Sequence, residues 1–149
     1  PGLKEFIRGI KDIGLDVKLD TNGSAPDVLE DLILEGLVDY IAMDIKSSPD
    51  NYDRVAGLAV DIGAIRRSAD LLLQGRVPFE FRTTLVRELH SVQDMERIGQ
   101  WLHGDEKYFL QTFENSGHLI GGGLTAFPRE DMESMRDVLR AYIPRAALR

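Results

Sequence analysis

Apolar residues recur along the chain with two alternating periods, one helical and one typical of strands. The helical spacing predicts helices over residues 3–13, 26–37, 62–74, 91–102 and 128–142. Alternating or continuous apolar segments predict strands over residues 15–19, 38–45, 78–86 and 108–111, with a short final strand at 147–148. The polar residues 47–61 and the glycine-rich residues 115–125 are predicted to be connections.

Two helix starts carry side-chain signals. Asn22 or Ser24 can cap the helix whose first turn contains Pro26. Ser91, followed three residues later by Asp94, resembles a capping box, although the usual acid at that position is glutamate.

Strands that alternate with helices of this length indicate βαβ units and a mostly parallel sheet, so the fold class is α/β. Four such units are too few to close an eight-stranded barrel. The pattern therefore fits part of a (β/α) barrel or a small doubly wound sheet, formed by one domain over residues 1–149.

The composition of the chain excludes several classes of partner and of chemistry. The 149 residues have a formal net charge of −7 without a lysine/arginine cluster, which argues against nucleic acid as the main partner. No apolar run approaches the length of a membrane span, and the expected location is the cytoplasm. The chain has no cysteine, which excludes disulfides, thiol catalysis and a self-contained iron–sulfur cluster.

Polar residues gather where the predicted strands end, which is where α/β folds place their chemistry. In strand order they are Asp20 and Thr21, then Asp44 and Lys46, then Arg82 and Thr84, and finally Gln111. The set suits a small zwitterionic ligand, because the basic groups would meet a carboxylate while the acids would meet an ammonium, a hydroxyl or a hard cation. Internal ion pairs that close the end of a barrel explain the same residues equally well.

Four segments resemble a known family when they are read in order: residues 18–23 (KLDTNG), 38–46 (VDYIAMDIK), 81–84 (FRTT) and 108–111 (YFLQ). Together they are similar to the later strands of radical S-adenosylmethionine (SAM) activating enzymes. The similarity is greatest to the activating proteins of anaerobic ribonucleoside-triphosphate reductase, with those of pyruvate formate-lyase as near relatives.

The resemblance implies a six-stranded partial (β/α) barrel, of which this chain supplies about the last four βα units. In the family a [4Fe–4S] cluster binds a CxxxCxxC loop after the first strand, and a GGEP-like turn follows the second. Both motifs are absent here, so strands one and two are expected to be missing. The cluster then belongs to a full-length parent only, and no catalytic residue is expected within this chain.

The resemblance also implies roles for residues. Asp20 and Thr21 would lie near the methionyl group of SAM and, with Asp44, could form a monovalent-cation site. Lys46 and Arg82 would supply positive charge to the SAM carboxylate or ribose. Gln111 would lie at the end of the last barrel strand, where contacts with adenine and substrate vary.

Three functions remain open at this stage. The first is a fragment of an activase that cleaves SAM reductively and generates a glycyl radical on a partner, expected to be anaerobic ribonucleotide reductase, with flavodoxin or ferredoxin as electron donor. The second is a non-redox module that binds SAM or a nucleotide. The third is an unrelated barrel enzyme that uses Asp44 and Lys46 in acid–base roles, which would require a buried Lys46.

If the preceding strands are absent, residues 15–19 form an open sheet edge. We expect that edge to pair with a second copy of the chain or with the terminal segment at 147–148.

Overall fold

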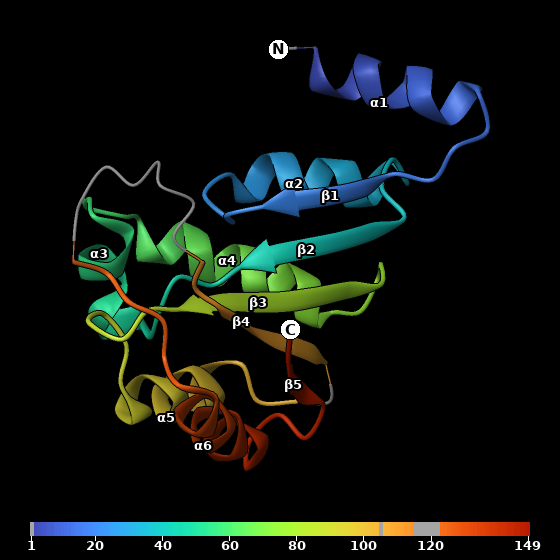
Figure 1. The fold of residues 1–149 in the computed structure, drawn as a ribbon. Helices are drawn as coiled ribbons and strands as arrows, with labels where there is room; N and C mark the ends of the chain where they lie inside the picture. Colours follow the sequence, from blue (N-terminus) through green and yellow to red (C-terminus); the bar gives the residue numbers. More distant parts are fainter. Residues whose placement is uncertain (1, 105, 115–122) are drawn as a thin grey trace. The chain divides into compact units, whose positions relative to one another are not determined.

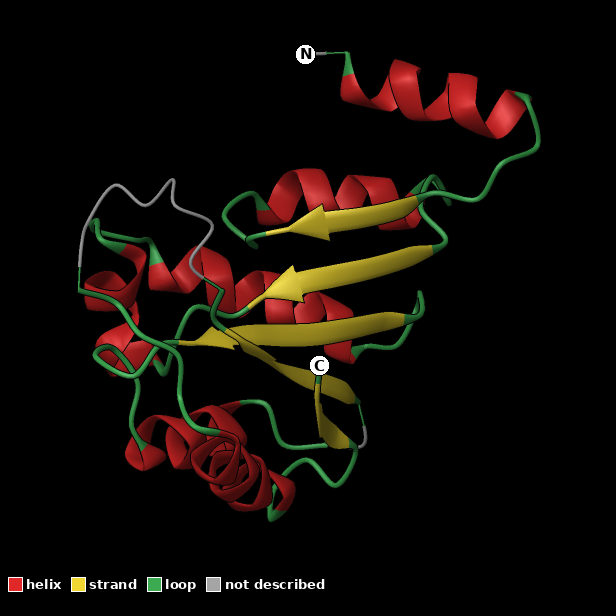
Figure 2. Cartoon of the chain, viewed as in Figure 1, coloured by secondary structure: helices red, strands yellow, loops and turns green. Residues whose placement is uncertain are grey.

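The computed structural model describes residues 2–104, 106–114 and 123–149 (Figure 1). Its elements are, in order, α1 (Leu3–Asp12), β1 (Lys18–Thr21), α2 (Pro26–Leu34), β2 (Tyr40–Asp44), η1 (Pro49–Asn51), α3 (Tyr52–Ala56), α4 (Ile62–Leu73), β3 (Phe79–Leu85), α5 (Val92–Trp101), β4 (Lys107–Thr112), α6 (Arg129–Arg140) and β5 (Ala146–Leu148). Strands and helices alternate through most of the chain (Figure 2). The predicted glycine-rich connection lies largely outside the described residues.

The five strands form one sheet in the order β1-β2-β3-β4-β5. The β1–β2 and β4–β5 pairs are parallel, as βαβ connections require. This open parallel sheet confirms the predicted α/β class. The chain divides into two compact units, Pro1–Asp44 with Asp61–Glu80 and Ile45–Val60 with Phe81–Arg149, called here the first and second units.

In the first unit, α2 and α4 cover one face of the strands. The sides of the two helices that face the strands are apolar. Leu29 and Leu32 of α2 are buried there, as are Ile65 and Leu72 of α4. The helical residues face the sheet because their three- and four-residue spacing places them on one side of each helix.

In the second unit, α5 and α6 lie side by side. Their inward residues include Met95, Ile98 and Leu139, which are buried. The capping box predicted at the start of α5 is present: Ser91 Oγ accepts the Asp94 N–H, and Asp94 Oδ2 accepts the Ser91 N–H.

Three local predictions were wrong. Strand β1 begins at Lys18, so Asp20 and Thr21 lie inside the strand rather than after it. Neither Asn22 nor Ser24 caps α2; Asn22 Oδ1 accepts both the Ser24 N–H and its hydroxyl, and the helix begins after Ala25. The connection at 47–61 contains η1 and α3.

The terminal segment was also predicted as a partner for the edge at residues 15–19. Strand β5 instead pairs with β4, which overturns that alternative. Among the described residues, β1 has a strand neighbour on one side only. Self-association through this edge stays a prediction.

Gly23 follows β1 with φ of +76°, a conformation that side chains disfavour, and an added Cβ would collide with Met43 Cε. We therefore expect Gly23→Ala to lower the free energy of unfolding by about 2 kcal/mol in urea titrations. Gly36→Ala is the control, because Gly36 also has a positive φ of +62° but open space around it. An equal loss in both variants would show that backbone strain alone is responsible.

Candidate functional site

The two acidic candidates of the first unit face the same side of the sheet. Asp20 stands opposite Ala42 in the parallel register of β1 and β2. Asp44 follows Ala42 by two residues, and because side chains alternate along a strand, all three share one face. Asp20 is exposed and Asp44 is half-buried. Two carboxylates on one accessible face suit a cation, an ammonium group or a hydroxyl.

Thr21 does not join them. It stands opposite Met43, on the other face of the pair. Its hydroxyl oxygen accepts the Gly23 N–H at 3.1 Å and so supports the turn after β1. Of the three residues predicted for a monovalent cation, the structure places only two side chains on a common face.

A buried carboxylate on β3 was not predicted. The Glu80 side chain is only 4 % exposed, and its Oε2 accepts the Tyr40 hydroxyl at 3.0 Å. Lys18 Nζ lies 3.6 Å from Glu80 Oε1 and 5.4 Å from the centroid of the Tyr40 ring. These residues come from all three strands of the first unit and form a polar layer. A glutamate between Phe79 and Phe81 was the signal that could have indicated it.

The basic candidates belong to the second unit. Within β3, Phe81 and Thr83 are buried, whereas Arg82 is half-buried and Thr84 is exposed. Alternation therefore turns Arg82 and Thr84 to the face opposite Phe81 and Thr83. Arg82 and Thr84 therefore share one face.

Lys46 lies just beyond β2, and Ile45 holds the chain in place before it. The Ile45 N–H donates to the Arg82 carbonyl at 2.9 Å, and Thr83 Oγ1 donates to the Ile45 carbonyl at 2.7 Å. Ile45 is fully buried, while Lys46 is exposed. An exposed lysine does not meet the burial that acid–base use of this amine would need, which argues against the unrelated barrel enzyme.

Gln111 has a neighbour that the sequence did not indicate. The Arg149 N–H donates to the Leu110 carbonyl at 2.9 Å, and the Thr112 N–H donates to the Arg149 carbonyl at 3.4 Å, so Arg149 stands opposite Gln111. The Arg149 guanidinium lies 3.8 Å from the centroid of the Phe109 ring, within cation–π range. A basic residue directly after the final strand was the available signal.

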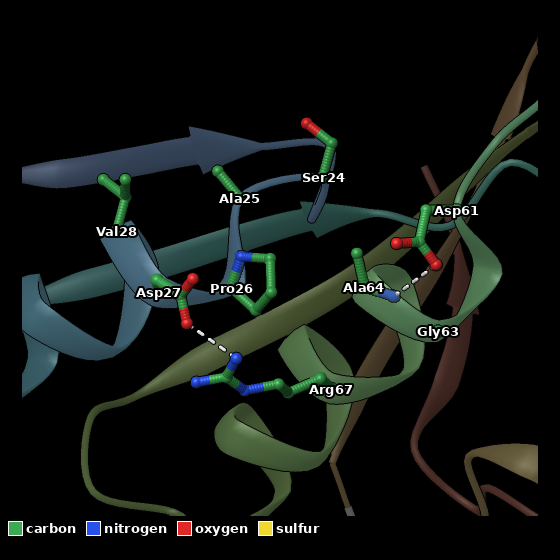
Figure 3. Close-up of a pocket in the computed structure, with 9 residues that line it drawn as sticks. All are labelled: Ser24, Ala25, Pro26, Asp27, Val28, Asp61, Gly63, Ala64 and Arg67. Carbon is green, nitrogen blue, oxygen red and sulfur yellow. Dashed lines mark hydrogen bonds and ion pairs between the residues drawn. The ribbon is translucent and has the colours of Figure 1, made fainter.

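A cavity of about 490 Å³ opens in the first unit beside the first turns of α2 and α4 (Figure 3). None of the seven candidate residues at the strand ends lines it. Arg67, its cationic residue, pairs with Asp27 at 2.6 Å and with Glu30 at 2.7 Å. The chain's own carboxylates thus neutralise this arginine, and the cavity has no built site for an anion.

Asp94 organises the backbone behind Lys46. Its Oδ1 accepts the Ser48 hydroxyl at 2.5 Å and the Ser47 hydroxyl at 3.3 Å, and its Oδ2 accepts the Ser91 hydroxyl at 2.8 Å. Burial alone would raise the pKa of Asp94, but the hydrogen bonds from Ser48 and Ser91 outweigh it and hold this pKa below its ordinary value. The carboxylate is therefore charged in the folded chain at neutral pH.

Because its pKa is lower in the folded chain, Asp94 stabilises the fold above its unfolded pKa of about 3.9 and loses that contribution as the pH falls through the folded pKa. We expect Asp94→Asn to lower the free energy of unfolding by about 2 kcal/mol at pH 7. The difference from wild type should shrink in urea titrations near pH 3. A difference that stays constant between the two pH values would contradict the assignment.

No family model matches the chain. A comparison with curated proteins finds a protein of Methanocaldococcus jannaschii that carries the name of a glycyl-radical enzyme activating enzyme. The two are 35 % identical over 114 residues, or 74 % of this chain. The chain is thus similar in sequence to a protein that is named as a glycyl-radical enzyme activating enzyme. It spans about half of that relative's length, 48 %.

Solved structures agree at the level of the fold. A domain of a pyruvate-formate lyase-activating enzyme from Bacteroides vulgatus superposes with a TM-score of 0.75 at 13 % identity, covering 99 % of this chain and 89 % of that domain. A radical SAM methyltransferase from Sphaerobacter thermophilus gives a TM-score of 0.70 at 17 % identity, over 89 % of this chain and 39 % of the enzyme. The fold of the chain is that of radical SAM enzyme domains.

The residues present do not fit an iron–sulfur cluster. The sequence has no cysteine, and the described residues contain no group of three or more histidine, aspartate or glutamate side chains that could hold a metal ion. No reaction step is therefore assigned to a cluster within this chain. Within the described residues, no helix is long and apolar enough to cross a membrane.

Proposed function

We propose that this chain is the SAM-binding portion of an activase that generates a glycyl radical on a partner enzyme by reductive cleavage of SAM. The homology to a glycyl-radical enzyme activating enzyme carries the proposal. The radical SAM fold and the polar residues at the strand ends support it. Because the chain has no cluster ligand, the redox chemistry is proposed for a full-length parent.

In the first unit, Asp20 and Asp44 present carboxylates that would meet the ammonium group of the methionyl moiety or a monovalent cation beside it. In the second unit, Arg82 and Lys46 would contact the SAM carboxylate or the ribose. Gln111 would lie near the adenine of SAM. Thr21 would support the turn after β1 through its hydroxyl.

We also propose a partner enzyme and an electron donor for the full-length parent. The name of the relative gives a glycyl-radical enzyme as the class of partner. We propose anaerobic ribonucleotide reductase within that class, flavodoxin or ferredoxin as the donor, and the cytoplasm as the location. The support for this choice is the resemblance of residues 18–23, 38–46, 81–84 and 108–111 to that branch of activating enzymes.

The test uses the protein encoded by the whole reading frame that contains this chain, purified and loaded with iron and sulfide without oxygen. With SAM and dithionite we expect 5′-deoxyadenosine and methionine in equal amounts, measured by chromatography. The 149-residue chain treated in the same way should give neither product. SAM binding without any cleavage by the full protein would favour the non-redox binding module instead.

A further inference from the structure

His90 is buried in the connection between β3 and α5, with only 6 % of its surface exposed. The connection is a tight turn, because the Leu89 and His90 N–H groups both donate to the Val86 carbonyl, at 3.1 and 2.9 Å. The imidazole ring therefore lies close to its own backbone on one side. Sequence reasoning assigned this histidine no role.

The hydrogen bonds of the ring require a proton on Nε2. A carbonyl oxygen can only accept, so His90 Nε2 donates to the Lys46 carbonyl at 2.9 Å. On the other side of the ring, Nδ1 lies 3.0 Å from the Val86 amide nitrogen, whose N–H points to it, and 3.2 Å from the Val86 carbonyl oxygen. The ring thus bridges two backbone segments that are 44 residues apart in sequence.

The residues after Lys46 are held from the same side. Both serine hydroxyls of Ser47 and Ser48 donate to Asp94, and Asn51 Nδ2 donates to the Leu89 carbonyl at 2.9 Å. The backbone around Lys46 is therefore fixed, although the lysine side chain is exposed. A flexible four-carbon side chain reaches one place reliably only when its backbone is fixed.

We propose that His90 is a positioning residue that fixes the backbone of Lys46 so that the Lys46 ammonium group is directed to the carboxylate of bound SAM. The inference rests on the proposed function, since it needs SAM as the ligand of Lys46. The ring of His90 hydrogen-bonds to the Lys46 carbonyl and to the Val86 backbone, so its effect on binding would pass through Lys46.

Two substitutions separate the two hydrogen bonds of the ring. In His90→Gln the side-chain amide can still donate to the Lys46 carbonyl but does not accept from Val86. In His90→Asn the shorter side chain can accept from Val86 but does not reach Lys46. The exposed His103, whose ring bonds only within its own helix end, provides the matched control His103→Asn.

Calorimetry of SAM binding to the 149-residue chain is the first measurement. We expect His90→Asn to raise the dissociation constant about 10-fold, while His90→Gln and His103→Asn change it by less than threefold. In a Lys46→Ala background, His90→Asn should have no further effect, because the group that it positions is gone. The same 10-fold loss in that background, or equal losses in His90→Asn and His90→Gln, would overturn the proposal.

A second measurement keeps the inference separate from the proposed function. If wild type binds no SAM, the proposed ligand fails, and positioning is tested by ¹⁵N relaxation of the Lys46 and Ser47 amides. Lower order parameters in His90→Asn than in His90→Gln would support the positioning role. Equal order parameters in the two variants would overturn it.

Discussion

Arg82→Ala is expected to weaken SAM binding by the 149-residue chain about 100-fold. The side chain lies half-buried on the accessible face of β3, where a guanidinium can form two parallel hydrogen bonds to a carboxylate. Removing one partner of such a pair costs about 3 kcal/mol, which corresponds to that factor. Calorimetry at low ionic strength gives the dissociation constant directly.

Two controls define the role of Arg82. Arg82→Lys keeps the charge without the planar fork and should lose only about 10-fold. Arg97→Ala removes an exposed arginine of the same unit, paired with Asp50 at 2.8 Å, and should leave the affinity unchanged. An Arg82→Ala variant that binds SAM as tightly as wild type would remove Arg82 from the proposed site.

Tyr108→Ala should lower the free energy of unfolding by about 4 kcal/mol, the largest stability effect that we expect. The ring is fully buried, with its centroid 6.1 Å from that of Phe81. Its hydroxyl donates at 2.7 Å to Thr83 Oγ1, which itself donates to the Ile45 carbonyl. Truncation would leave a cavity at the point that holds the backbone before Lys46.

Tyr108→Phe isolates the hydroxyl of Tyr108. Thr83 still donates to the Ile45 carbonyl in this variant, so we expect a loss of only about 1 kcal/mol in urea titrations. Burial also raises the pKa of Tyr108, so the ionised form is disfavoured in the folded chain, and stability should fall as the pH rises above about 10. Tyr108→Phe should lose less stability than wild type over that alkaline range. Equal losses for the alanine and phenylalanine variants would place the effect in the hydroxyl rather than in packing.

The elements that sequence reasoning predicted well are those with local causes. The capping box of α5 depends on Ser91 and Asp94, three residues apart, and both of its hydrogen bonds are present. The alternation of β3, which leaves Arg82 half-buried and Thr83 buried, follows from the period of a strand. The α/β class followed in the same way from alternating helices and strands.

The errors have physical causes that spacing does not show. Asn22 was a reasonable candidate for a helix cap. Its side-chain oxygen instead accepts hydrogen bonds from the Ser24 N–H and hydroxyl in a local turn. Helix α3 was missed because one residue, Tyr52, is buried in its short polar sequence. Each of these local structures depends on contacts between a few atoms, which a repeating pattern of residues does not reveal.

The parts of the site that could not be predicted depend on residues far apart in sequence. Glu80 meets Tyr40 across 40 residues, and His90 meets the Lys46 carbonyl across 44. Neither of these separations in sequence follows from the period of a helix or a strand. Each arises because parallel strands bring distant segments together only after a helix has crossed between them.

The most direct test of the central claim is to read the coding DNA on the 5′ side of the codon for Pro1. We expect an in-frame CxxxCxxC motif and a glycine-rich turn within about 60–100 codons, roughly half a domain. These are the two motifs that the family places before the segment seen here. A reading frame that begins near Pro1, with no cysteine-bearing segment in the same protein, would contradict the proposal that this chain is part of a radical SAM activase.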